Sequence, residues 1–132
     1  MAFTGPIDDQ LAIRTLHDRY ADAVFRRDAA AWGILWADDA RWHLMDRTVD
    51  GQAAIVAMWT GAMASFAFVA FFAQVGAIEV DGSSAAGRVY TNEVLEDHAG
   101  AVTRTVGRYD DRYVRGSDGW RYQARTFTSL KG

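Results

Sequence analysis

The sequence has no cysteine, one proline and three histidines among its 132 residues. The absence of cysteine excludes disulfide scaffolds, thiolate metal sites and cysteine nucleophiles. Basic residues are also outnumbered, because 14 Lys and Arg face 17 Asp and Glu and leave a formal net charge of −3. We therefore expect no nucleic-acid partner, since no positive field attracts a phosphate backbone.

Motifs for metals and cofactors are missing as well. The histidines, His17, His43 and His98, lack the spacing of metal ligands, and the twelve glycines occur singly rather than in a phosphate-binding loop. No serine stands in the strained turn that hydrolases use for their nucleophile. We expect neither a metal ion nor a cofactor. His17 borders an apolar helix face, and we interpret it as a buried histidine with satisfied hydrogen bonds.

One long stretch of the chain carries no charge, from Gly51 to Ile78. It is long enough to cross a bilayer, but polar residues interrupt it, acidic residues flank it, and neither end has a basic anchor. The first nine residues also lack the basic and apolar regions of a secretion signal. We therefore expect a cytoplasmic protein without a membrane partner.

Half of the residues are apolar and 13% are aromatic, which is enough for one large core. We expect a single domain over residues 1–132 from this length. Apolar residues at helical spacing predict a first helix over about 8–27. A short second helix follows, which Asp28 caps and which Asp38 and Asp39 end.

The pattern then changes to alternation. It predicts a strand over 40–46 and a turn over 48–51, and Asp50 caps a third helix that stops near Ser65. The rest of the chain predicts a meander of long antiparallel strands, over residues 66–73, 75–80, 85–97, 102–115 and 120–128. The first of these consists of eight apolar residues, which favours a central strand covered on both faces. Helices followed by a meander indicate an α+β fold.

Four segments carry a familiar pattern in one order along the chain: RYADAVFRRD, LWADDARW, IEVDGSSAAGRVY and GRYDDRYVRGSDGWRYQAR. Together they resemble the SnoaL-like, ketosteroid isomerase-like branch of the nuclear transport factor two-like superfamily. Relatives in that branch include scytalone dehydratase, a hexachlorocyclohexane dehydrochlorinase and polyketide cyclase-like proteins. The resemblance covers nearly the whole chain. It implies a cone, or cystatin-like α+β barrel, in which a strongly curved antiparallel sheet wraps around the N-terminal helices and leaves a deep apolar pocket. It also implies a homodimer.

The resemblance also implies where catalytic groups belong. Scytalone dehydratase and the dehydrochlorinase use a His and Asp pair, in which the carboxylate orients an imidazole that moves the substrate proton. The Asp position is filled here by Phe25, and the strand that carries the His offers only Phe71, Phe72 and Ala73 before Gln74. We therefore expect the His and Asp machinery to be absent.

Ketosteroid isomerase uses a Tyr, a neutral Asp that donates a hydrogen bond, and a separate Asp base. The Tyr corresponds to Tyr20, and the neutral Asp to Asp111, or to Asp110 if the register differs by one. The base position falls on Leu44. Alternation places Asp46 on the Leu44 face and His43 on the other, so Asp46 is the better substitute for the base.

Three functions follow from this resemblance. The first is an isomerase, dehydratase or cyclase for an apolar carbonyl-bearing or polycyclic compound, with Tyr20, Asp111 and Asp46 as catalytic residues. Its substrate-binding residues are Phe25, Trp42, Leu44, Trp59, Phe72 and Tyr113. The second is a non-catalytic ligand-binding or accessory homodimeric domain, because the pocket is more apolar than in catalytic relatives. The third is a structural dimer, in which exposed aromatic residues such as Tyr122 and Phe127 form the interface.

Overall fold

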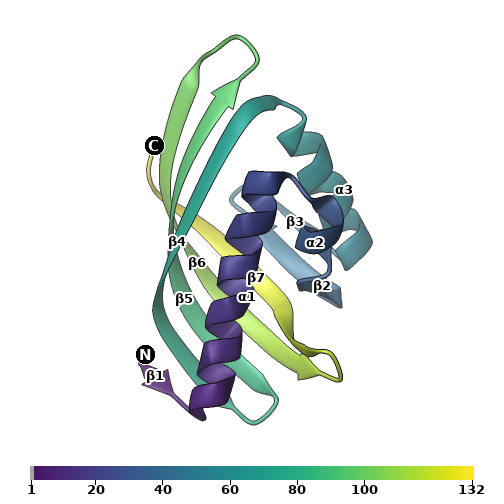
Figure 1. Cartoon of the computed structure of the whole chain (residues 1–132), viewed down its shortest axis with the longest axis vertical. Helices are drawn as coiled ribbons and strands as arrows, with labels where there is room; N and C mark the ends of the chain where they lie inside the picture. The colour runs from purple at the N-terminus through teal and green to yellow at the C-terminus, as the bar shows by residue number, and fades with distance from the viewer. Residues whose placement is uncertain (1) are drawn as a thin grey trace.

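The computed structural model describes residues 2–132 and shows helices on the inner side of one large sheet (Figure 1). The elements are β1 (Phe3–Thr4), α1 (Ile7–Arg26), α2 (Ala29–Gly33), β2 (Trp36–Leu44), β3 (Arg47–Asp50), α3 (Gln52–Met63), β4 (Phe66–Asp81), β5 (Ser84–Asp97), β6 (Val102–Gly116) and β7 (Gly119–Lys131). The predicted α+β class is confirmed. None of the helices in this part of the chain is both long and apolar enough to cross a membrane.

Helix α1 forms where the sequence predicts it, one residue earlier at each end. Asp8 and Asp9 lie in its first turn, where acidic side chains interact favourably with the helix dipole. Its buried stripe consists of Ile13, Leu16, His17, Tyr20, Ala23 and Val24. Asp28 caps α2 as predicted, because its carboxylate accepts a hydrogen bond of 3.0 Å from the backbone N–H of Ala31.

The predicted boundary between the second helix and the first strand is wrong. Helix α2 ends at Gly33, and β2 already begins at Trp36. Asp38 and Asp39 therefore lie inside a strand and do not end a helix. Their side chains are exposed, whereas Trp36 is fully buried. The buried position of Trp36 therefore belongs to the strand and not to the second helix.

The segment predicted as a turn over 48–51 is also different in the structure. It contains most of β3, which pairs antiparallel with β2. Thr48 and Val49 are β-branched and suit a strand, and the turn of this hairpin falls instead at Met45 and Asp46. The residue before α3 that acts as its N-cap is Gly51 rather than Asp50.

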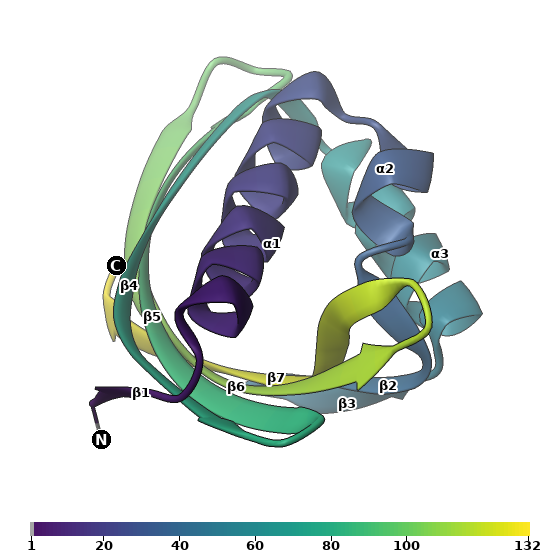
Figure 2. The same ribbon diagram turned by 60° about the horizontal axis from the view of Figure 1, so that its bottom comes forward.

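Strand β4 is longer and less enclosed than predicted. It pairs with β5 across residue 74, where the sequence predicts a break between two strands, and its register shifts only between Phe66 and Phe68 and between Val75 and Ala77. Phe68 and Phe72 are 51% and 56% exposed. The prediction of a strand covered on both faces is therefore wrong, because the helices cover only the inner face of the sheet (Figure 2).

The sheet is one strongly curved layer with the strand order β1-β4-β5-β6-β7-β2-β3. Figure 2 shows that it curls around α1, as the resemblance implies. The sheet is mixed rather than antiparallel throughout, because β1 pairs with β4 and β2 pairs with β7 in parallel. Its edge strands, β1 and β3, do not pair with each other, so the curved sheet stays open.

Two glycines of the middle strands let aromatic rings approach the sheet closely. A Cβ atom at Gly87 would lie 2.6 Å from the hydroxyl oxygen of Tyr113, and one at Gly107 would lie 2.3 Å from the ring of Phe127. Side-chain atoms do not approach that closely without displacing one another. The inner face therefore has room for these two rings only because both positions lack a side chain.

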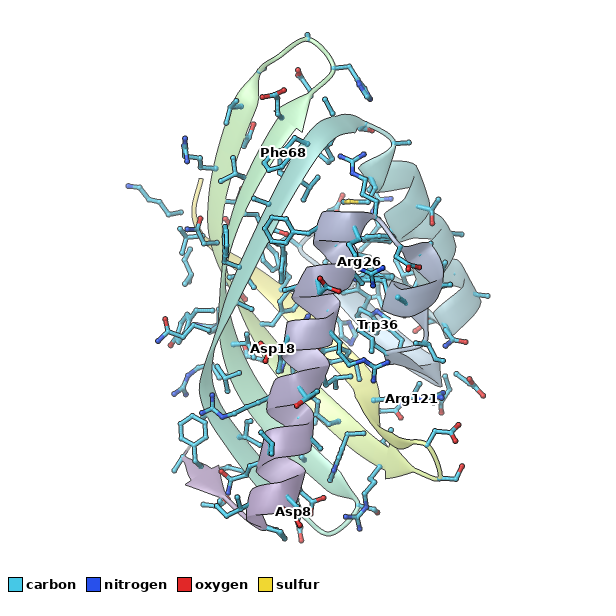
Figure 3. All side chains as sticks on the ribbon, in the orientation of Figure 1. Asp8, Asp18, Arg26, Trp36, Phe68 and Arg121 are labelled. Carbon is cyan, nitrogen blue, oxygen red and sulfur yellow. The ribbon has the colours of Figure 1, made fainter. Side chains whose placement is uncertain are left out.

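Tryptophan rings fill the space between the helices and β2. Trp32 stacks on Trp59 with ring centres 4.6 Å apart, and Trp36 lies 5.5 Å from Trp32 and 5.7 Å from Trp42. Such pairs contribute about 0.5–1.5 kcal/mol each beyond their buried area. Figure 3 shows Trp36 beside α1, while Phe68 lies near the start of β4. This part of the cone is therefore packed core.

We expect Gly87→Ala to lower the free energy of unfolding by about 1–3 kcal/mol, because the new methyl group overlaps the Tyr113 side chain. Gly61→Ala in α3 is the matched control. Nothing lies within 4 Å of the added methyl group there, so helix propensity predicts a gain of up to about 1 kcal/mol. Urea unfolding measures both changes, and equal effects would contradict the close approach at Gly87.

Candidate functional site

Tyr20 lies on the inner stripe of α1 and is only 3% exposed. Aromatic rings surround it, with ring centres at 5.2 Å for Phe71 of β4 and at 5.6 Å for both Trp32 and Tyr122. Burial raises the pKa of the Tyr20 phenol, so the hydroxyl keeps its proton at neutral pH. Tyr20 therefore places a neutral hydrogen-bond donor inside the curved sheet.

A buried ion pair joins β6 to β7 on the inner face of the sheet, close to Tyr20. Asp111 and Arg125 are register partners, and the guanidinium donates to both carboxylate oxygens, over 2.8 Å from Nε and 3.1 Å from Nη2. Arg125 is fully buried and Asp111 is 3% exposed. This two-fold geometry is the strong form of a charge-assisted hydrogen bond.

Sequence reasoning missed Arg125 because a bulge changes the alternation of β7. Tyr122 pairs with Tyr113, but the next register pair joins Ala124 to Arg112, which leaves Gln123 as an extra residue. Strict alternation from inward-facing Tyr122 would place Arg125 on the outer face. The bulge reverses this and brings the guanidinium inside.

The pairing with Arg125 changes the role expected for Asp111. Burial raises the pKa of the Asp111 carboxyl, and the Arg125 guanidinium opposes that shift. A carboxylate that accepts two hydrogen bonds from a guanidinium is ionised, so it does not donate a hydrogen bond as a neutral acid. Asp110, the alternative residue, lies on the outer face and pairs with Arg108.

His17 links this ion pair to α1. Tyr113 donates its hydroxyl hydrogen to Asp111 Oδ2 at 3.1 Å, so it accepts from His17 Nε2 at 2.6 Å. His17 Nδ1 then accepts from the Tyr122 hydroxyl at 2.8 Å. Burial lowers the pKa of His17 well below its usual range, and Arg125 adds to that effect, so the imidazole is neutral. The chain of donors and acceptors is complete, which agrees with a structural histidine.

Three tyrosine rings enclose the rest of the Arg125 guanidinium. Its central carbon lies 3.8 Å from the ring centre of Tyr109, 4.5 Å from that of Tyr122 and 4.7 Å from that of Tyr20. Ring faces carry partial negative charge and attract a cation. The charge of Arg125 is therefore balanced by one carboxylate and three aromatic faces.

Glu93 is a second inward-facing carboxyl group, which sequence reasoning missed. It lies two residues beyond buried Thr91 on β5 and is the register partner of buried Phe71, so its half-buried side chain faces the inside of the curve. Burial raises the pKa of Glu93 from 4.5 to about 7, and Arg125 opposes part of that shift. The sequence did contain a signal for Glu93. Strict alternation along β5 places it on the same face as the buried residues Val89 and Thr91.

Several buried polar atoms near Tyr20 and Glu93 have no hydrogen-bond partner within residues 2–132. They are Trp32 Nε1, Trp36 Nε1, Thr91 Oγ1 and Arg125 Nη1. The rings of Trp32 and Trp36 lie against Tyr20, and Thr91 shares the inner face of β5 with Glu93. Buried polar atoms are rarely left unpaired, so a concentration of them is unusual for a plain core.

The structure brings some of the other predicted site residues to this interior. The Trp42 indole donates to the Tyr109 hydroxyl at 3.1 Å, and Trp59 stacks on Trp32. Leu44 is half-buried at the end of β2. Tyr113 lies fully enclosed among Asp111 and His17 rather than at an opening.

The remaining predicted residues lie elsewhere. Phe25 and Phe72 are both exposed and pack against each other at 5.4 Å, because Phe72 points away from the inward-facing Phe71. Asp46 is in the β2–β3 turn, 73% exposed, and pairs with Arg47. The structure does not bring these three residues to Tyr20.

The predicted interface aromatics also face inward. Tyr122 is fully buried, and Phe127 packs on Tyr109 with ring centres 5.1 Å apart. The expectation that they lie on the outer face is therefore wrong. Tyr122 is the register partner of inward-facing Tyr113, and the bulge at Gln123 then brings Phe127 to the same face. Among residues 2–132, no group of three or more acidic or histidine side chains is arranged to hold a metal ion.

The sequence matches the model of the SnoaL-like domain family over residues 6–126. No curated protein matches it. Among solved structures, a Novosphingobium aromaticivorans protein provisionally named an aromatic ring hydroxylase is 26% identical with a TM-score of 0.90, over 98% of this chain and 94% of its own.

Two further structures are similar in fold. A provisionally named scytalone dehydratase from Novosphingobium aromaticivorans is 15% identical with a TM-score of 0.88, over 95% of this chain and 86% of its own. A hexachlorocyclohexane dehydrochlorinase is 17% identical with a TM-score of 0.80, over 96% of this chain and 91% of its own. At these identities the likeness concerns the fold.

We expect Asp111→Asn to lower the free energy of unfolding by about 3–5 kcal/mol, because it leaves the buried charge of Arg125 without its counterion. Asp110→Asn is the matched control on the same strand, where the exposed pair with Arg108 contributes at most about 1 kcal/mol. Denaturant unfolding near pH 7 compares the two variants. A similar small loss in both would show that the buried pair is not a main source of stability.

We also expect the stability to depend on the ionisation of Glu93. The folded-state pKa of about 7 exceeds the ordinary 4.5, so the folded protein binds this proton more tightly than the unfolded chain. The resulting stabilisation is complete below pH 4.5 and is lost as the pH rises through about 7.

Glu93→Gln removes this loss. The difference in free energy of unfolding, variant minus wild type, should be larger at pH 8 than at pH 5 by roughly 1–3 kcal/mol. This range allows for partial exposure of the carboxyl group. Urea unfolding at the two pH values measures the change, with outward-facing Glu96→Gln as the control. A difference that does not vary with pH would contradict the raised pKa.

Proposed function

The chain belongs to the family of SnoaL-like domains, and on that premise we propose that it is an isomerase, dehydratase or cyclase acting on an apolar carbonyl-bearing or polycyclic compound. Similar structures carry the names dehydratase and dehydrochlorinase. Both names describe reactions in which a proton leaves a carbon atom. These names support the reaction class rather than a particular substrate.

The observation that carries the proposal is the set of unpartnered polar atoms around Tyr20. An interior made only for packing leaves few such atoms, because each unpaired buried group costs about 1–3 kcal/mol. Here the indole N–H groups of Trp32 and Trp36 lie beside Tyr20, and neither forms a hydrogen bond of normal length within the described residues, although Trp32 is near enough to the Tyr20 hydroxyl to lower the pKa of that group. A bound substrate oxygen would supply the missing acceptor.

The proposed chemistry needs a donor at the substrate oxygen. When a proton leaves the carbon next to a carbonyl group, negative charge develops on the carbonyl oxygen. We assign Tyr20 to that oxygen, because burial keeps its hydroxyl protonated. The apolar part of the substrate would contact aromatic and aliphatic side chains of the same interior, among them Trp59, Leu44 and Phe127.

A non-catalytic ligand-binding domain is the second candidate function. Phe25 occupies the position that the resemblance assigns to the Asp, the segment from Phe71 to Ala73 lies where it places the His, and Asp111 is held by Arg125. On this alternative an apolar ligand binds beside Tyr20, but no proton is exchanged. The two candidates therefore differ in turnover and not in binding.

We expect the wild-type protein to catalyse exchange of the carbon-bound protons of β-tetralone, an apolar bicyclic ketone, in deuterated buffer. Tyr20→Phe should lower the exchange rate about 10²–10³-fold, because it removes one donor to the developing oxyanion. NMR measures exchange, and quenching of tryptophan fluorescence measures binding. Exchange that is unchanged in Tyr20→Phe would remove Tyr20 from the mechanism.

Tyr90→Phe is the matched control, because Tyr90 is an exposed residue of β5. It should leave exchange and binding unchanged. Both variants should melt within a few degrees of wild type, since each loses one oxygen atom and no ring. Wild-type protein that binds β-tetralone without any exchange above buffer would favour the ligand-binding alternative.

A further inference from the structure

We propose that Glu93 is the catalytic group that carries the proton in this site. The inference rests on the proposed function, and it replaces Asp46, the residue that the sequence favours for this role. It assigns a general acid and base to β5, next to its register partner Phe71 on the neighbouring strand β4. Neither the family match nor the solved neighbours assign a role to this position.

The register of the sheet places Glu93 on the same side as Tyr20. Glu93 pairs with Phe71 on β4 and with Thr105 on β6. Side chains of directly paired residues lie on one face of a sheet, and Phe71 contacts the Tyr20 ring at 5.2 Å. Glu93 therefore faces the interior that contains the proposed oxygen donor.

Glu93 interacts electrostatically with charged and titratable groups of three other elements. Arg125 of β7 favours its ionised form, and the charge of Glu93 in turn raises the pKa of Tyr20 on α1 and of Tyr109 on β6. Arg125 itself contacts both rings, since its guanidinium carbon lies 3.8 Å from the ring centre of Tyr109 and 4.7 Å from that of Tyr20. Glu93 lies on the same inner face of the sheet, within electrostatic range of these groups.

Glu93 differs from Asp111, the other inward carboxyl group, in having no partner. Asp111 accepts hydrogen bonds from Arg125 and Tyr113, whereas Glu93 forms no hydrogen bond or ion pair within residues 2–132. A half-buried carboxylate without a partner destabilises the folded state. Glutamine or an apolar residue would avoid this cost, so the position suits a group that exchanges protons with a ligand.

The protonation equilibrium of Glu93 also suits this role. A general acid and base works best when its pKa lies near the working pH, and that of Glu93 is about 7. Asp46 does not meet this requirement. Its hydrogen bond with Arg47 lowers the pKa of Asp46, and its side chain lies in an exposed turn.

The proposed step is an internal proton transfer that needs no other reactant. The Glu93 carboxylate takes a proton from the carbon next to the substrate carbonyl group. The C–H electron pair forms a new C=C bond, and the carbonyl π electrons move to the oxygen, where Tyr20 donates a hydrogen bond. Glu93 then returns the proton to a different carbon as the carbonyl group re-forms, which gives an isomer without any oxidation or reduction.

The test compares Glu93→Gln with Glu96→Gln in the β-tetralone exchange assay. Glu96 lies on the same strand but pairs with exposed Phe68, so its replacement removes the same charge from outside the interior. We expect Glu93→Gln to lower exchange at least 100-fold while β-tetralone still quenches tryptophan fluorescence. Glu96→Gln should retain the wild-type rate.

Two further readouts separate a catalytic role from a structural one. Wild-type exchange should increase with pH to a plateau, with a midpoint near 7, and Glu93→Asp should keep a measurable rate with a similar pH dependence. Infrared difference spectra should show a carboxyl group that titrates near the same pH in wild type and is missing in Glu93→Gln.

The possible failures are distinguishable. If wild-type protein exchanges β-tetralone and Glu93→Gln retains that rate, the assignment of Glu93 is overturned and the proposed function stands. If wild-type protein binds β-tetralone but shows no exchange at any pH, the proposed function fails, and the role of Glu93 fails with it.

Discussion

The buried pair of Asp111 and Arg125 is the interaction on which the interior of this protein depends. It joins β6 to β7 from the inside of the curve, and three tyrosine rings and one histidine pack around it. Two isolated charges at this depth would be strongly unfavourable. The aromatic faces and the hydrogen bonds of Tyr113 and His17 therefore belong with the pair as one unit, and they fix the orientation of the rings next to Tyr20.

The two inward carboxyl groups, Asp111 and Glu93, have different surroundings, and we assign only Glu93 to the proposed reaction. Asp111 has every strong partner that a carboxylate needs, so it holds strands together. Glu93 shares the electrostatic field of Arg125 but none of its hydrogen bonds. A group in this situation gains and loses protons near neutral pH. Arg125 therefore acts on both carboxyl groups. It forms hydrogen bonds with Asp111, and it favours the ionised form of Glu93 through its electric field.

The family fold is retained while the expected catalytic groups are replaced. Phe25 stands where the resemblance places an Asp, and the segment from Phe71 to Ala73 stands where it places a His. Asp46 lies in an exposed turn. Four tryptophans pack much of the space between the helices and β2. The proposed proton-transfer site therefore combines Tyr20 of α1 with Glu93 of the middle strand β5.

The sequence by itself determined α1 and its buried stripe, the Asp28 cap, the α+β order and the inward position of Tyr20, because helical spacing and capping depend on neighbouring residues. It also led to the family through four ordered segments. Only the tertiary structure decided the rest: that Asp111 is ion-paired, that Arg125 is inside, that Phe72 is outside and that Glu93 lies on the inner face of the sheet. These positions depend on the bulge at Gln123, on strand register and on the curvature of the sheet, which are set by contacts between residues far apart in the chain.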